Sequence, residues 1–170
     1  MRQRFRFNHW YGMLCMCAIG LVLDHVAWAQ APNETYDFSI SKGIVEFSRG
    51  HYDKAADLFE QARQAVPNDP EAIEYLGQTL LRLKKYPEAE TLFHDLTLSH
   101  PTRTQAWLGL AISQGQLGLY QEALASLDQA QKLDPKNPLV LFYQGVVSHE
   151  LKSFNQSPEL FSREIGRAHV

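Results

Sequence analysis

Residues 86–101 read YPEAETLFHDLTLSHP, and a matching pattern returns 34 positions later, at 120–135, as YQEALASLDQAQKLDP. It also stands 34 positions earlier, at 52–67, as YDKAADLFEQARQAVP. A tyrosine opens each stretch, an alanine is its fourth residue and a proline closes it, and Phe154 continues the aromatic series. A fixed period of this length indicates one small unit stacked on copies of itself, an architecture that usually offers a surface to a partner.

Each unit contains two amphipathic stretches of about a dozen residues, which predicts a pair of helices. In the second unit we expect them near 71–83 and 87–99. Gly77 on the first stretch and Ala89 on the second are small, so the paired helices are expected to approach closely. Asp69-Pro70 and Asn137-Pro138 each read as a helix cap followed by the first helical residue. Pro87 and Pro158 are expected in the first turn of a second helix.

In this register the residues fall on the positions that define tetratricopeptide repeats. The second unit supplies Leu76, Gly77, Tyr86, Ala89, Phe93 and Pro101, and the third supplies Trp107, Leu110, Tyr120, Ala123, Ala130 and Pro135. The chain therefore resembles the tetratricopeptide repeat (TPR) family. The resemblance implies an all-α solenoid of antiparallel helix pairs with about 3.5 repeats. The expected repeats are 36–69, 70–103, 104–137 and a partial fourth at 138–164, preceded by a short linker at 30–35.

The first 29 residues have the composition of a secretory signal peptide. Three arginines open the segment, 13 uncharged and mostly apolar residues follow at 11–23, and Ala27-Trp28-Ala29 supplies the small residues of a cleavage site. The apolar run is too short to span a bilayer comfortably. We expect cleavage after Ala29, and the alternative interpretation is an uncleaved anchor. Removal of 1–29 takes away both cysteines and leaves no predicted membrane span, so we expect a secreted or periplasmic protein.

The fourth unit and the last residues depart from the pattern. Gln144, Ser157 and Glu164 stand where Leu, Ala and Ala are expected, so this repeat is predicted to be partial or truncated within its second helix. The end reads Ile165-Gly166-Arg167-Ala168-His169-Val170, and ATC GGA AGA GCA CAC GTC, part of a common sequencing adapter, encodes those residues. The hypothesis is that 165–170 are an adapter artefact; the alternative is a coincidental short tail.

In TPR arrays a partner usually binds along the concave face, at the second, fifth, ninth, twelfth and thirteenth residues of each first helix. These positions include Arg82, Gln105, Gln116, Leu139 and Glu150. The candidate peptide-binding residues chosen from this face are Ile40, Ile44, Phe47, Glu74, Gln78, Leu81, Leu108, Ile112, Phe142 and Val146. The fifth and ninth positions lack the Lys, Asn and Arg of the TPR class that grips a C-terminal carboxylate, so no such clamp is expected. A largely apolar face suits an amphipathic or extended apolar segment.

The sequence predicts no enzyme, no cofactor and no nucleic-acid partner. It contains no Walker loop, dinucleotide fingerprint, G-x-S-x-G or H-E-x-x-H motif, and its formal net charge is −3. The expected function is an exported scaffold for protein–protein interaction. Three alternatives remain open: a segment of this protein covers the groove, the array self-associates through an uncapped end, or the chain is the N-terminal TPR region of a longer enzyme or secretion or envelope-assembly component.

Overall fold

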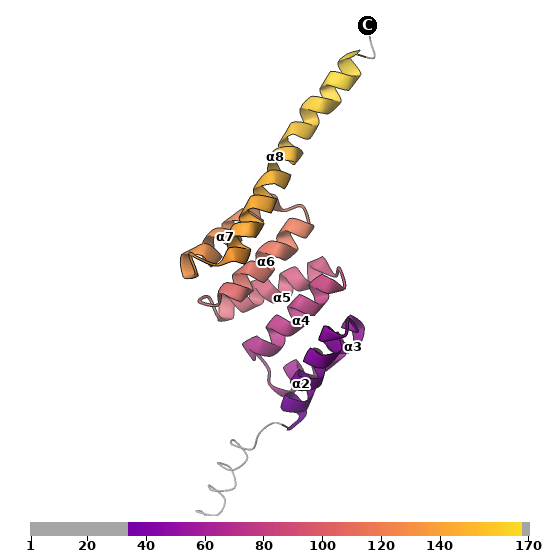
Figure 1. The fold of residues 1–170 in the computed structure, drawn as a ribbon, viewed down its shortest axis with the longest axis vertical. Coiled ribbons are helices and arrows are strands. Elements are labelled where there is room, and N and C mark those ends of the chain that lie inside the picture. Colours follow the sequence, from indigo (N-terminus) through magenta and orange to yellow (C-terminus); the bar gives the residue numbers. More distant parts are fainter. Residues whose placement is uncertain (1–33, 168–170) are drawn as a thin grey trace, which may run out of the picture. The chain divides into compact units, whose positions relative to one another are not determined.

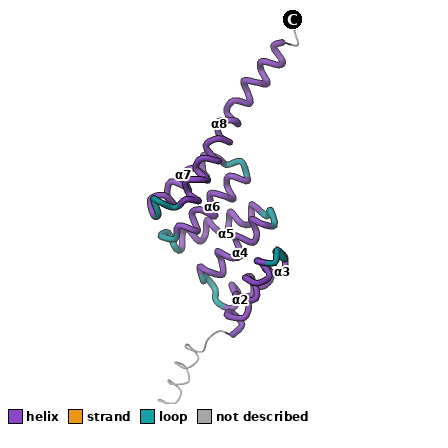
Figure 2. The backbone as a smooth tube through the Cα atoms, viewed as in Figure 1, coloured by secondary structure: helices purple, strands orange, loops and turns teal. Residues whose placement is uncertain are grey.

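The computed structural model describes the backbone of residues 34–167 and the side chains of residues 34–155. The chain forms α-helices joined by short loops (Figures 1 and 2). The predicted signal peptide, residues 30–33 and residues 168–170 lie outside this range. Within it there is no strand, and the predicted all-α fold is confirmed. The helices are α2 (Glu34–Ser48), α3 (Tyr52–Ala65), α4 (Pro70–Arg82), α5 (Tyr86–Ser99), α6 (Thr104–Gln116), α7 (Tyr120–Leu133) and α8 (Pro138–Arg167).

The chain divides into two units, Met1–Glu34 and Thr35–Val170. All the described helices belong to the second unit, except that Glu34, the first residue of α2, is assigned to the first. From α3 onward each helix packs against the next one in the chain. In addition α4 contacts α6, and α6 contacts α8. The first helices of the second, third and fourth repeats therefore lie side by side as one layer.

The same turn joins the two helices in each of the first three repeats. Gly50, Lys84 and Gly118 have positive φ values of 80°, 60° and 79°, and they stand 34 residues apart. After each of them the next backbone N–H donates to the carbonyl five residues earlier, as in His51 to Glu46, at 2.9 Å in all three turns. This left-handed closure satisfies the last carbonyls of the first helix and reverses the chain.

Aromatic rings of the second helices pack directly on glycines of the first. Phe93 of α5 is 1% exposed, and a Cβ built on Gly77 of α4 would lie 2.6 Å from its ring. Gly109 of α6 meets the same ring from the next repeat. Phe59 of α3 packs in the same way on Gly43, and its ring also stacks on Tyr75 of α4, with ring centroids 5.1 Å apart. Each ring thus links one repeat to the next.

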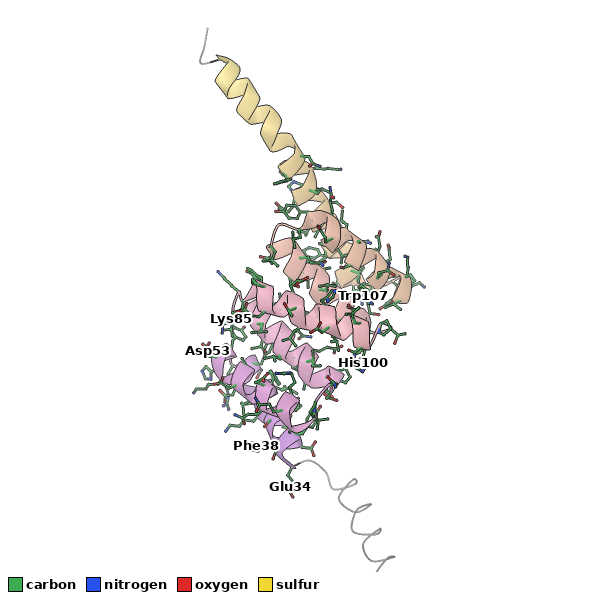
Figure 3. The ribbon with its side chains drawn as sticks, turned by 180° about the vertical axis from the view of Figure 1, so that it is seen from behind. Glu34, Phe38, Asp53, Lys85, His100 and Trp107 are labelled. Carbon is green, nitrogen blue, oxygen red and sulfur yellow. The ribbon has the colours of Figure 1, made fainter. Side chains whose placement is uncertain are left out.

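Polar contacts fix the loops between repeats. The Asp69 carboxylate accepts the backbone N–H of Ala72 at 2.8 Å, as the predicted cap of α4, and also accepts the Tyr36 hydroxyl at 2.7 Å. Between α5 and α6, Trp107 Nε1 donates to the Pro101 carbonyl at 2.8 Å, in the region where Figure 3 labels Trp107 and His100. Asn137 Oδ1 accepts backbone N–H groups at the start of α8, as its predicted role as a cap requires.

The fourth repeat differs from the expectation of a helix, a turn and a second helix. α8 is one continuous helix of 30 residues, with Pro158 inside it. Lys152 stands 34 residues after the left-handed Gly118 but is helical. Gly145 matches Gly77 in register, yet nothing lies within 4 Å of a Cβ built on it. Because no described second helix packs on α8, nothing compensates for the cost of a left-handed lysine, and continued helix satisfies the backbone locally.

The packing at Gly77 generates a test of stability. Gly77→Ala is expected to destabilise the protein by about 1–2 kcal/mol, because the added methyl overpacks the Phe93 ring by more than the gain in helix propensity. Gly145→Ala, at the equivalent but open position, is the control and is expected to gain about 0.5–1 kcal/mol. Urea unfolding of the three proteins checks both changes, and equal stability of the two variants would contradict this packing.

Candidate binding groove

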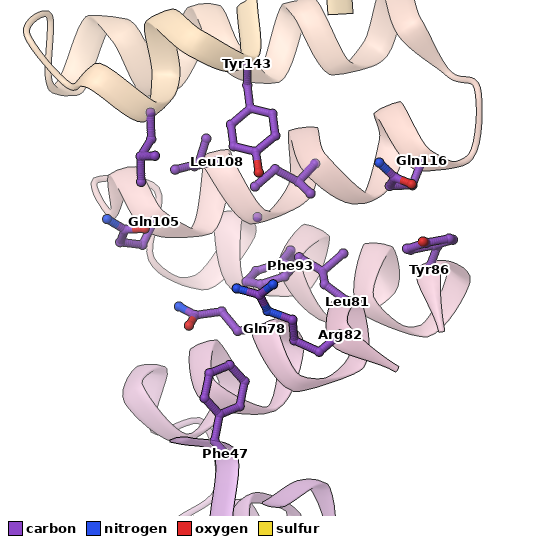
Figure 4. Close-up of a pocket in the computed structure, with 13 residues that line it drawn as sticks. Phe47, Gln78, Leu81, Arg82, Tyr86, Phe93, Gln105, Leu108, Gln116 and Tyr143 are labelled. Atoms are coloured by element: carbon purple, nitrogen blue, oxygen red, sulfur yellow. The ribbon is translucent and has the colours of Figure 1, made fainter. Parts of the chain in front are cut away.

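A hollow of about 530 Å³ runs over the layer of first helices, and we call it the inner groove (Figure 4). Helices α2, α4, α6 and α8 supply most of its wall, and α5 supplies two aromatic residues. Its lining consists of Phe47, Gln78, Leu81, Arg82, Tyr86, Phe93, Gln105, Leu108, Gly109, Ile112, Gln116, Leu139 and Tyr143. The wall is therefore built from regular helices, whose mutual packing sets its shape.

Position 109, where a glycine replaces the tyrosine of the neighbouring repeats, shapes the floor of the inner groove. The equivalent positions of the neighbouring repeats carry Tyr75 and Tyr143. Gly109 has no side chain, and the ring of Phe93 occupies the space that a Cβ would need. Both residues consequently belong to the lining, and the groove has an aromatic floor between α4 and α6.

The structure brings together half of the candidate residues that the sequence predicts. Phe47, Gln78, Leu81, Leu108 and Ile112 all line the inner groove, although Leu108 is only 4% exposed. Apolar and amide side chains thus meet on one surface from three different repeats, as the concave-face pattern predicts.

The other five predicted residues lie elsewhere. Ile40 is buried in the core between α2, α3 and α4, and Ile44 is 38% exposed outside the groove lining. Glu74 is held by an ion pair. Phe142 lines a further shallow hollow on α8, and Val146 lines both that hollow and the one that adjoins the inner groove, described below. Whether any of these residues contacts a partner stays a prediction.

Sequence reasoning did not select several residues of the groove as candidates. Arg82, Gln105, Gln116 and Leu139 occupy concave-face positions, so the register of the repeats was a sufficient signal for them. Tyr86, Phe93, Gly109 and Tyr143 lie outside those positions. Tyr86 and Phe93 coincide with repeat-signature residues that are expected to pack between helices. No sequence signal separates their packing role from a place in the lining.

Glu74 is engaged within the protein. Arg103, just before α6, donates from Nε to Glu74 Oε1 at 2.6 Å and from a terminal nitrogen to Oε2 at 3.1 Å. The hydrogen bond to Glu74 raises the pKa of Arg103 above its ordinary value, although partial burial opposes the shift. This forked pair, whose two residues both belong to the second repeat, joins α4 to the start of α6 and removes Glu74 from the set of free carboxylates.

A second, smaller hollow of about 290 Å³ adjoins the inner groove, and we call it the α8 hollow. Its lining consists of Ala111, Ile112, Gly115, Gln116, Tyr120, Tyr143, Val146, Val147 and Glu150. Ile112, Gln116 and Tyr143 belong to both linings. The two hollows are therefore parts of one continuous surface that runs from α4 across α6 to α8.

The described residues contain neither a cluster of metal ligands nor a helix that could span a membrane. Within the part of the chain that the structure covers, no three His, Cys, Asp or Glu side chains gather in a way that would hold a metal ion. No helix among the same residues has both the length and the apolar character needed to cross a bilayer.

Comparison with known proteins identifies the architecture. Two sequence models of the tetratricopeptide repeat match residues 46–113 and 108–168, and together they cover more than half of the chain. The chain belongs to the tetratricopeptide repeat family. The TPR prediction made from the 34-residue period is thereby confirmed, while the signal peptide stays a prediction.

The TPR chain is similar to part of a much longer yeast protein. It is 28% identical over 91 residues to the peroxisomal targeting signal receptor of Saccharomyces cerevisiae. The match covers 54% of this chain and 15% of that receptor. The likeness therefore concerns a segment of the receptor and not its full length.

Solved structures share the fold. The first TPR domain of human RPAP3 has a TM-score of 0.70 and 23% identity, over 74% of this chain and 99% of that one. The first TPR of Spaghetti (RPAP3), bound to the HSP90 peptide SRMEEVD, has a TM-score of 0.67 and 22% identity, over 71% of this chain and 96% of that one. At these identities the likeness establishes the fold alone.

The Glu74–Arg103 pair generates a prediction about stability. Glu74→Gln is expected to destabilise the protein by about 1 kcal/mol, because a part-buried forked ion pair is replaced by weaker neutral hydrogen bonds. Asp57→Asn, at an exposed carboxylate within α3, is the control and is expected to change stability by less than about 0.5 kcal/mol. Chemical unfolding checks both variants. A Glu74→Gln protein as stable as the control would show that the pair does not hold α4 and α6 together.

Proposed function

We propose that this TPR chain is an exported scaffold that binds an apolar or amphipathic segment of a partner protein in the inner groove. The observation that carries the proposal is the groove itself, with apolar, aromatic and amide side chains converging from four repeats. Such a lining suits a peptide, because apolar pockets receive side chains while Gln78, Gln105 and Gln116 offer hydrogen bonds to a backbone. A wall built from packed helices also limits the ordering cost to the partner.

The similar proteins support recognition of a protein segment and leave its identity open. The structure of Spaghetti (RPAP3) contains a bound HSP90 peptide, and the yeast relative is a targeting signal receptor. From these proteins we carry over to this chain only the binding of a peptide-like segment. The groove lining contains a single charged side chain, Arg82, so it lacks the cluster of cations expected of a carboxylate clamp.

Export is the second part of the proposal. The charged start, apolar run and Ala27-Trp28-Ala29 exit support delivery across a membrane, and we propose the periplasm of a Gram-negative bacterium as the destination. The alternative is that the chain is the N-terminal TPR region of a longer enzyme or secretion or envelope-assembly component. This alternative is worth testing because the match covers only 15% of the yeast receptor, so a TPR segment of this kind can be part of a much longer protein. The complete reading frame decides between them, since a catalytic or barrel domain supports the alternative and a capping helix supports the scaffold.

Groove binding is tested with Leu139→Asp. Leu139 lines the inner groove and is 51% exposed, so an aspartate there should leave the fold intact but place a charge against an apolar segment. The 12-residue peptides that the mature chain selects best from a random array serve as ligands, with fluorescence anisotropy as the readout. We expect affinity to fall about tenfold or more, since about 1.4 kcal/mol corresponds to a factor of ten.

Leu98→Asp is the matched control for this experiment. Leu98 is 70% exposed on α5 and does not line the groove. We expect its affinity to stay within about twofold of the original, since surface substitutions away from a site have small effects. Equal affinity of the two variants, or no selection of any peptide by the folded chain, would refute binding in the inner groove.

Export is tested by mass spectrometry of the protein recovered from the envelope of an expressing Gram-negative host. The expected first residue is Gln30, because cleavage follows Ala29. Ala29→Asp is expected to retain residues 1–29, since the cleavage site requires a small residue there. A native chain that still begins at Met1 in the cytoplasm would exclude export by this route.

A further inference from the structure

Arg82 differs from the other arginines whose side chains the structure describes, because it has no acidic partner. Among the side chains of residues 34–155 there are four arginines, and three of them form ion pairs. Arg49 pairs with Glu46 at 3.2 Å, Arg63 with Glu60 at 2.6 Å and Arg103 with Glu74 at 2.6 Å. Arg82 ends α4, is exposed and extends into the inner groove beside Gln78 (Figure 4). The groove lining contains no Asp or Glu that would neutralise it.

Glu150 provides the opposite charge at the other end of the same surface. It lines the α8 hollow, and its side chain is 51% exposed. The nearest described basic atom is Nδ1 of its exposed neighbour His149, at 3.9 Å, which is beyond hydrogen-bond distance. No Lys or Arg belongs to the lining of the α8 hollow.

The two charges are members of one repeat position. Arg82, Gln116 and Glu150 stand 34 residues apart, each at the thirteenth position of its helix, in α4, α6 and α8. Stacking of α4, α6 and α8 places this position in a row, and Gln116 lines both hollows. The row therefore runs from a cation through a neutral amide to an anion, with the apolar residues of the groove beside it.

We propose that this charge gradient selects a partner segment with an acidic residue and a basic residue separated by apolar residues. The acidic residue lies at Arg82 and the basic residue at Glu150, so the gradient fixes the orientation of the segment. Complementary charges set register and exclude the reverse arrangement, in which like charges face each other. The inference rests on the proposed function, because it specifies the ligand of the same groove.

Helix spacing gives the distance between the two charges of the ligand. Packed helices lie about 8–10 Å apart, so two steps from α4 to α8 cover about 16–20 Å. An extended chain advances about 3.3 Å per residue, and the two charged residues are therefore expected about five or six positions apart.

The experiment uses a synthetic peptide library with two fixed positions separated by five residues drawn from Leu, Phe and Ser. Each fixed position is Asp, Lys or Ser, and affinities for the mature chain are measured by fluorescence anisotropy. Peptides with one Asp and one Lys are expected to bind about fivefold more tightly than those with two Asp or two Lys, the range of a partly exposed ion pair. One of the two orders, Asp first or Lys first, is expected to be favoured.

Charge-reversal variants identify the residues responsible. Arg82→Glu is expected to shift the preference to two Lys, and Glu150→Lys to shift it to two Asp. The double variant is expected to restore the preference for one of each, in the reverse order. Lys132→Glu, on an exposed site of α7 outside both linings, changes net charge as Arg82→Glu does and is expected to leave the pattern unaltered.

The outcomes separate the two proposals. Binding that Leu139→Asp abolishes, but that responds to neither charge reversal, overturns the charge gradient and leaves groove binding intact. A response to Lys132→Glu equal to that to Arg82→Glu also overturns it, since net charge would then explain the preference. Absence of binding to every peptide of the library refutes both proposals.

Discussion

The contact between the Phe93 ring and the two glycines that face it is the constraint on which the arrangement of this chain depends. Gly77 and Gly109 belong to different repeats, and neither can carry a side chain while the ring occupies its place. The ring therefore sets how closely α4, α5 and α6 approach, and with that the width of the surface between α4 and α6. Because packed interiors deform little, this local fit fixes the shape of the groove several residues away.

The sequence predicts the regular part of the fold because local interactions determine it. Helices begin at Tyr52, Tyr86 and Tyr120, and the turns before them use residues in the left-handed region. The fourth repeat departs from this pattern, because α8 continues through Lys152, where the sequence predicts a turn and a truncated second helix. The 34-residue period shows which residues are equivalent between repeats. Whether a turn forms also depends on the packing of the helix that comes after it.

The site was predictable only in part, for a related reason. The concave-face register identifies which side of each first helix faces the groove, and five of the chosen residues lie there. It does not reveal that Arg103 engages Glu74 from 29 residues away, or that Ile40 is buried. Nor does the register reveal that the Phe93 ring fills the space beside Gly109, whereas the equivalent positions carry tyrosines. A pairing between two side chains depends on both residues at once, whereas the repeat pattern describes each position separately.

Positions that obey the repeat and positions that depart from it therefore serve different purposes. The regular 34-residue spacing of glycines, alanines and aromatic rings within this chain builds a scaffold. In this scaffold the residues at any one repeat position lie in a row. A row of identical residues would present a uniform surface with no preferred direction. The change from Arg82 through Gln116 to Glu150 gives the surface a direction without altering a buried contact. Because exposed residues can vary at little cost in stability, specificity in such an array can arise from its exposed rows while the core keeps its period.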